Sequence, residues 1–152
     1  MADDLYDQDF YLWTQAQAAA LRARAGDNAL DYEHLAEEIG DLGSAQRNKA
    51  ESFTRLILQH LYKLAACPEA QPVGHWWVEI ENWRADLEQV LTGAIRRDIL
   101  AKLDRIHAKA ARIAATDLAN YEAAATVDAT RRWTLAQILG EVDDLITPWI
   151  EL

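Results

Sequence analysis

Apolar side chains recur every three to four positions along most of the chain, with polar residues between them, and this spacing predicts α-helices. The first predicted helix runs from about Asp7 to Gly26 and turns Phe10, Trp13 and Leu21 to one side. We expect Asp7 to be its N-cap, because a carboxylate there accepts hydrogen bonds from free backbone N–H groups. We expect Gly26 to end it, because glycine tolerates the left-handed conformation that follows many helices.

The second predicted helix opens at Asp31 and continues to the CPEAQP segment at residues 67–72. Its apolar positions keep helical phase, and we expect them to face the core: Leu35, Ile39, Leu42, Phe53, Leu56, Ile57, Leu61 and Leu64. Gly40 and Gly43 interrupt the pattern. Either they kink one long helix, or Gly43 ends one helix and Ser44 caps another.

Two further long helices are predicted after residue 72. One runs from about His75 to Thr92, is closed by Gly93, and has apolar positions at Trp76, Ile80, Trp83, Leu87 and Leu91. The other is defined by Ile99, Leu103, Ile106, Ala110, Ile113 and Ala114. Residues 121–132 have no clear period, Thr134 then caps a short helix through Leu139, and the chain ends in a segment containing Pro148-Trp149.

These elements predict an all-α fold, an antiparallel helical bundle of about four main helices with one or two short C-terminal helices. The strand pattern is almost absent, and glycine and proline are scarce, at six and three residues. No repeat, low-complexity segment or linker divides the chain. We therefore expect residues 1–152 to form a single helical domain with one core.

Charge and cysteine content limit the possible locations and partners. The net charge is −10, which repels nucleic acid and membrane surfaces with anionic lipids and favours cationic partners. No apolar run is long enough to span a membrane, and the acidic start MADDLYDQDF does not resemble a signal peptide. The single Cys67 cannot form an internal disulfide. We expect a soluble, cytoplasmic protein.

The HLAEE stretch at residues 34–38 is the first candidate for a metal or acid–base site. His34, Glu37 and Glu38 are residue types that hold metals, but di-iron bundles use Glu-x-x-His on two helices with all ligands facing inward. At about 100° per residue, His34 and Glu37 point away from the apolar face, and Glu38 lies about 70° from its centre. We expect a solvated helix face with Glu38 paired at its edge, and no metal.

A second candidate lies between the second and third predicted helices. His60 sits within an apolar run, so we expect it to be buried, either as a ligand or base or as a core histidine with a hydrogen-bond partner. An antiparallel third helix would bring Glu79, Trp83 and Arg84 beside it. These four residues form our candidate pocket. The structural alternative is an ion-paired Arg84 stacked on Trp83.

Two surface features remain. Trp77 lies about 70° from the apolar centre of its helix, so it either packs at the boundary of the core or anchors a partner. Residues 96–112 are locally basic, and a stripe of four cations follows this helix: Lys102, Arg105, Lys109 and Arg112. We expect the stripe to face solvent or the acidic segments Asp3–Asp9 and Glu141–Asp144. Nucleic acid binding is disfavoured because no aromatic residues are interleaved for base stacking.

Several motifs resemble those of the bacterial family catalogued as Domain of Unknown Function 29. They are YDQDFYLW, LDYEHLAEEIGDLG at residues 30–43, HLYK at 60–63, the pattern of Trp76, Ile80 and Arg84, and WTLAQIL at 133–139. The chain departs from the family pattern at Trp77, at Gly93-Ala94-Ile95 and at Arg132. The resemblance implies an all-helical domain and assigns no activity.

The sequence therefore supports two hypotheses of function. The first is a small interaction module without catalytic activity or cofactor, which self-associates or binds another protein through an exposed apolar patch that includes Trp77. The second is a ligand-binding or enzymatic bundle with its site at His60 and Arg84. Nothing in the sequence resembles a phosphate-binding loop, a nucleophile elbow or a zinc motif.

Overall fold

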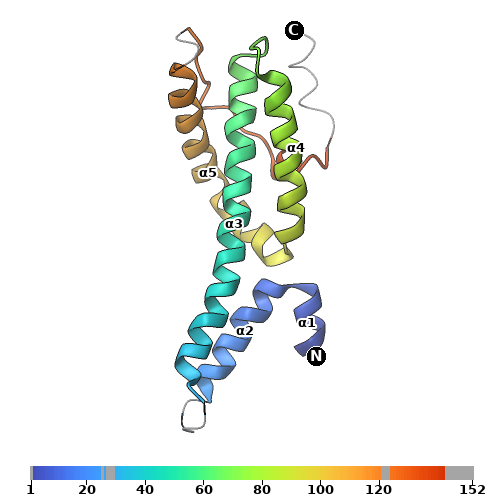
Figure 1. Ribbon diagram of the computed structural model, residues 1–152, viewed down its shortest axis with the longest axis vertical. Helices are drawn as coiled ribbons and strands as arrows, with labels where there is room; N and C mark the ends of the chain where they lie inside the picture. The colour runs from blue at the N-terminus through green and yellow to red at the C-terminus, as the bar shows by residue number, and fades with distance from the viewer. Residues whose placement is uncertain (1, 25, 27–29, 121–123, 143–152) are drawn as a thin grey trace. The chain divides into compact units, whose positions relative to one another are not determined.

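The computed structural model describes residues 2–24, 26, 30–120 and 124–142, and every regular element in these residues is a helix. The elements are α1 (Ala2–Gln8), α2 (Phe10–Ala23), α3 (Tyr32–Ala66), α4 (Val73–Val90), α5 (Gly93–Ala119) and α6 (Leu135–Ile138) (Figure 1). The predicted all-α class is confirmed. The terminal segment with Pro148-Trp149 lies outside the described residues.

The contacts of the chain group into two compact units. We call residues 1–50 with 90–99 the N-terminal unit, and residues 51–89 with 100–152 the C-terminal unit. Both α3 and α5 contribute residues to each unit. The expectation of one helical domain over residues 1–152 stays a prediction.

The start of the chain differs from the prediction of one helix beginning at Asp7. Two helices meet there, and Asp9 is the N-cap of α2, its Oδ1 accepting from the backbone N–H of Leu12 at 3.0 Å. Asp7 lies within α1 instead. Helix α2 ends at Ala23 with Arg24 as its C-cap, so the predicted end at Gly26 is also wrong. Sequence reasoning placed the cap two residues too early because Asp7 and Asp9 are both good capping residues.

Helix α3 is continuous from Tyr32 to Ala66, which settles the choice between one helix and two. Gly43 does not break it. A β-carbon on Gly43 would lie 2.0 Å from Oγ1 of Thr14, and one on Gly40 would lie 3.9 Å from the Ala18 β-carbon. Gly43 therefore lets α2 approach α3 closely, whereas a β-carbon at Gly40 would make only an ordinary contact.

The small residues, not the large ones, form the buried face of this part of α3. Ala36 is fully buried, whereas Leu35 and Leu42 are 40% and 58% exposed. The expectation that these leucines point into the core is wrong. At about 100° per residue, Leu35 lies more than a quarter turn around the helix from Ala36. Close packing on α2 uses the side of α3 that carries small residues, so Leu35 and Leu42 lie outside this contact.

In the C-terminal unit, α4 runs antiparallel to α3, and α5 lies beside α3 and runs parallel to it (Figure 1). The core of this unit includes Ile57, Leu61, Ile80, Leu87 and Ile106, all buried as their spacing predicted. Gly93 does not close α4, as we expected, but begins α5. The chain turns between Val90 and Gly93, and the backbone N–H of Arg96 donates to Thr92 O at 2.8 Å.

A polar network also lies in this unit. The Tyr62 hydroxyl donates to Arg131 O at 2.7 Å and lies 2.9 Å from Nδ1 of His107, whose Nε2 is 3.0 Å from Trp133 O. The predicted cap at Thr134 is confirmed, since its side chain accepts from the N–H of Gln137 in a capping box that opens α6. These bonds anchor the segment that precedes α6 to the helices.

Candidate functional site

His60 lies at the centre of an aromatic and acidic cluster between α3 and α4. It is 7% exposed, as predicted, and its Nε2 bonds to Oε2 of Glu79. Its ring centroid is 4.8 Å from Trp83 and 6.2 Å from Trp76, both at steep interplanar angles. The structure thus brings together three members of the predicted pocket, His60, Glu79 and Trp83.

The surroundings of His60 determine which of its two ring nitrogens carries a proton. Burial lowers the pKa of His60 below its ordinary value, against the opposing effect of the Glu79 hydrogen bond. The bond from His60 lowers the pKa of Glu79. His60 Nδ1 is buried without a hydrogen-bond partner, so a second proton there would be a buried donor with no acceptor. The pair is therefore a neutral imidazole donating to a carboxylate.

The fourth predicted pocket residue, Arg84, is directed to another element. Its Nε donates to Ile138 O at 2.9 Å and its Nη2 to Gln137 O at 3.0 Å, while Nη1 pairs with the exposed Glu81. It thus bonds to two carbonyls and one carboxylate, and none of these polar contacts involves His60. Arg84 closes the C-terminal end of α6, where free carbonyls and the helix dipole favour a cation.

Two cations lie over tryptophan rings in the described part of this unit, Lys63 over Trp76 and Arg131 over Trp133, and neither is Arg84. Lys63 Nζ lies 4.9 Å from the Trp76 ring centroid and donates to Oδ2 of Asp117 at 2.9 Å. Lys63 is 7% exposed. Sequence reasoning missed this ion pair. The one available signal was the HLYK motif, which places a lysine at the end of an apolar run one turn from His60.

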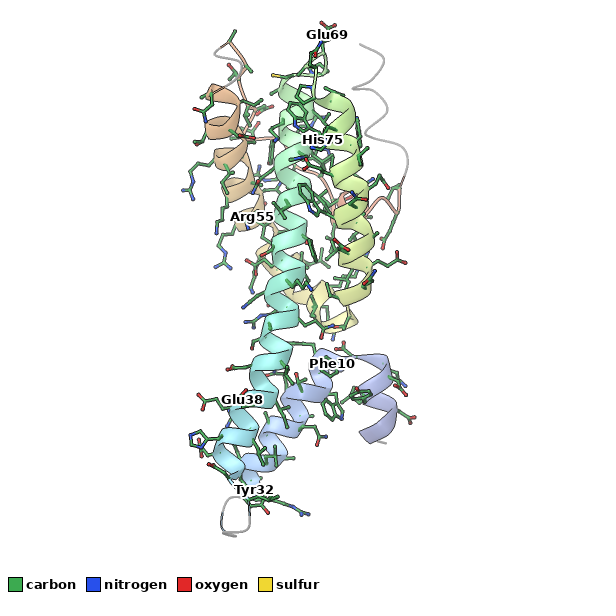
Figure 2. The ribbon with its side chains drawn as sticks, in the orientation of Figure 1. Phe10, Tyr32, Glu38, Arg55, Glu69 and His75 are labelled. Carbon is green, nitrogen blue, oxygen red and sulfur yellow. The ribbon has the colours of Figure 1, made fainter. Side chains whose placement is uncertain are left out.

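Beside this pair is a cavity of about 390 Å³. Lys63, Pro72, Trp76, Asp117 and Leu118 are among its lining residues, so it lies between the C-terminal ends of α3 and α5 and the beginning of α4. Figure 2 shows Glu69 in the connection that leads to α4 and His75 in the first turn of that helix. A cavity with apolar walls and a buried lysine paired with a partly exposed carboxylate has the composition of many small-molecule sites.

The structure does not bring the weak metal candidates together. His34 Nδ1 pairs with Asp31 Oδ2 at 2.6 Å, and this bond raises the pKa of His34. Glu37 and Glu38 are exposed, as expected for a solvated helix face, and the pairing of Glu38 stays a prediction; Figure 2 shows its side chain directed away from α2. Among residues 2–24, 26, 30–120 and 124–142, no three His, Cys, Asp or Glu side chains are grouped to hold a metal ion.

Trp77, the predicted interaction residue, is half-buried, and its Nε1 is buried without a hydrogen-bond partner. Its neighbour Val78 is 57% exposed. Exposed apolar side chains also lie on α3 in the N-terminal unit. There Leu35, Ile39 and Leu42 recur at helical spacing on α3, and the two leucines are exposed. We call these three residues the leucine stripe.

The basic stripe of α5 has a partner that the sequence did not indicate. Lys102 Nζ and Arg105 Nη2 lie 3.3 and 3.9 Å from the two carboxylate oxygens of Glu51 on α3. Lys109 and Arg112 are exposed. Of the acidic segments that we expected to meet the stripe, Asp143 and Asp144 lie outside the described residues. In the described part of the chain, no helix is both long and apolar enough to cross a membrane.

Comparison with known proteins agrees with this fold. No curated protein matches the chain. The crystal structure of an α-helical protein of unknown function from Rhodospirillum rubrum is similar, with 28% sequence identity and a TM-score of 0.80 over 97% of this chain and 96% of that one. The family model described as Domain of unknown function DUF29 matches residues 5–142. The chain belongs to this family, as its motifs implied.

Proposed function

We propose that this protein is an interaction module that binds an apolar, basic protein surface through the leucine stripe of α3. The observation that carries the proposal is the exposure of Leu35 and Leu42, at 40% and 58%, on a helix whose small-residue face is already packed. Large apolar side chains aligned on one helix face are typical of helix-in-groove or helix–helix recognition.

The charge around the stripe favours a basic partner. At about 100° per residue, Glu38 lies within about 60° of Leu35, and Asp31 precedes the helix on the same side. Both residues are exposed. The net charge of −10 adds a long-range attraction for cations. Two copies that met stripe to stripe would bring these carboxylates together, which disfavours self-association through this face.

We propose binding without a chemical reaction and without a cofactor. We also propose a cytoplasmic location, because the sequence has a single cysteine, Cys67, so the fold needs no internal disulfide and is compatible with a reducing compartment. Trp77 and Val78 are a less favourable docking site, since the tryptophan is already half-buried and the exposed apolar area there rests on one valine.

A pair of designed helical peptides tests the proposal. Both carry leucine along one face, and the opposite face carries lysine in one peptide and glutamate in the other. Fluorescence anisotropy should give tighter binding of the lysine peptide, and the double substitution Leu35→Ser with Leu42→Ser should weaken it about tenfold or more, because two apolar side chains no longer become buried. Val78→Ser, equally exposed on α4, should leave binding unchanged.

Two results would overturn the proposal. Equal binding of the lysine peptide by the wild-type protein and the double variant would show that the stripe is not the contact surface. A dimer in light scattering that the double variant converts to a monomer would make the stripe a self-association surface, not a site for a basic partner. Circular dichroism of each variant confirms that the helices are intact.

A further inference from the structure

The cavity beside Lys63 has the size and the lining of a small-molecule site. Its volume, about 390 Å³, falls within the range of about 300–1,000 Å³ typical of ligand pockets. Pro72, Trp76 and Leu118 supply apolar walls, and Lys63 and Asp117 supply charge. The cavity lies within the C-terminal unit, so it is independent of the leucine stripe on the N-terminal unit.

Among the described residues, the neighbours of Lys63 do not use the full hydrogen-bonding capacity of its ammonium group. The residue is 7% exposed, and an ammonium carries three N–H donors. Asp117 Oδ2 accepts one of them at 2.9 Å, and the face of Trp76, with its centroid 4.9 Å from Nζ, attracts the charge without providing an oxygen acceptor. Because buried donors without acceptors are costly, an oxygen atom in the cavity would stabilise this group.

Asp117 does not compete strongly for the lysine. Its side chain is 42% exposed, so water can solvate its carboxylate when a second acceptor approaches Lys63. The other nearby carboxylate, Glu79, is already bonded to His60. A cationic ligand would have to approach a buried ammonium that already occupies the aromatic face of Trp76. The charges therefore favour an anion over a cation.

We propose that this cavity binds a small organic carboxylate with an apolar body. The carboxylate accepts hydrogen bonds from Lys63 Nζ, and the apolar body packs against Trp76, Pro72 and Leu118. The apolar walls select against inorganic anions, which would leave that surface unfilled. The charge of the buried lysine selects against the uncharged amide or alcohol of the same shape.

Isothermal titration calorimetry with four probes tests this assignment: benzoate, hexanoate, and their uncharged counterparts benzamide and hexanol. We expect both carboxylates to bind the wild-type protein, with the uncharged probes about tenfold weaker or more. The substitution Lys63→Met, which keeps the apolar stem, should weaken benzoate binding about tenfold or more. Lys49→Met, at an exposed position of the same helix, should leave it unchanged.

The variant Asp117→Asn gives a prediction of opposite sign. It removes the anion that shares Lys63, so benzoate should bind several-fold more tightly than to the wild-type protein. Because Asp117 is partly exposed, this variant is expected to fold. It therefore tests the role of Lys63 in benzoate binding even if Lys63→Met fails to fold. The indole N–H resonance of Trp76, identified in nuclear magnetic resonance spectra by its loss in Trp76→Phe, should shift when benzoate is added.

Three outcomes would overturn the proposal. One is that neither carboxylate binds at millimolar concentration, and another is that benzoate and benzamide bind equally. The third is that Asp117→Asn weakens benzoate binding, which would show that Asp117 supports binding and does not compete with the carboxylate for Lys63.

Discussion

Gly43 lies so close to Thr14 that a β-carbon on it would stand 2.0 Å from the threonine Oγ1. Thr14 is fully buried, and its hydroxyl already donates to Tyr11 O at 2.7 Å, so it cannot move aside without losing this bond. The contact fixes the face that α3 presents to α2. It is also the reason that the larger Leu35 and Leu42 remain outside.

Substitution of Gly43 by alanine should therefore destabilise the packing of α2 on α3. We expect a loss of about 1–3 kcal/mol in the free energy of unfolding, the usual cost of overpacking a close contact. Urea denaturation followed by circular dichroism measures it. Gly74→Ala is the matched control, since nothing lies within 4 Å of its added β-carbon, and it should be neutral or stabilising by up to about 1 kcal/mol. Equal stability of the two variants would contradict this account.

Asp9 caps two helices with one carboxylate. Its Oδ1 accepts from Leu12 N–H at the start of α2, and its Oδ2 accepts from Ala94 N–H in the first turn of α5, at 2.9 Å. Asp9→Ala should cost about 2–3 kcal/mol of stability, because a cap and a charge-assisted bond are lost together. Asp9→Asn, with a single acceptor oxygen, should cost less. The exposed Asp7→Ala should change the thermal midpoint little, and a loss as large as that of Asp9→Ala would argue against a capping role.

Arg84 holds the end of α6 through a planar group that lysine cannot replace. Two of its nitrogens donate to the carbonyls of Ile138 and Gln137. Arg84→Lys should destabilise the protein by about 1–2 kcal/mol, because a single ammonium cannot reproduce both bonds. Glu81→Ala should cost less than about 0.5 kcal/mol, since its side chain is 65% exposed. Chemical denaturation of the three proteins in parallel compares these values.

Gly140 provides an independent test of the same contact. It is the one residue in the described part of the chain with a positive φ, 73°, and a β-carbon there would lie 3.1 Å from the Arg84 guanidinium. Gly140→Ala should cost about 1–3 kcal/mol through backbone strain and this clash. The loss should be smaller in an Arg84→Ala background, which relieves the clash but not the strain. Fully additive losses would contradict the contact.

Stability should fall as the pH drops below the ordinary histidine pKa of about 6.5. Burial lowers the pKa of His60 and the pKa of His107, so the unfolded chain binds more protons than the folded one between the folded and unfolded values. The stabilisation that comes from keeping His60 and His107 neutral is complete above about pH 6.5 and is lost as the pH falls below this value. Urea midpoints from pH 7.5 to 5.5 measure this window, which lies above the titration of the carboxylates.

Removing one buried histidine should flatten this dependence. His60→Gln keeps a donor for Glu79 but does not titrate, so its urea midpoint should change less between pH 7.5 and 5.5 than that of the wild-type protein. His34→Gln is the control. His34 is exposed, and its bond with Asp31 raises its pKa, the opposite direction, so its removal should not flatten the curve. A wild-type curve that is flat over this range would contradict the neutral, buried state of His60.

The sequence by itself determined the helical class, most of the core in the C-terminal unit, the burial of His60 and the cap at Thr134. Each depends on the local spacing of residue types or on a side chain that bonds to the backbone a few residues away, and the sequence shows both directly. Tertiary packing decided the rest. Gly43 does not break α3 but forms a close contact with α2, and Leu35 and Leu42 remain exposed. Arg84 and Lys63 bond to partners more than fifty residues away in sequence. Such choices depend on which helix faces meet in space, and helical periodicity alone does not contain that information.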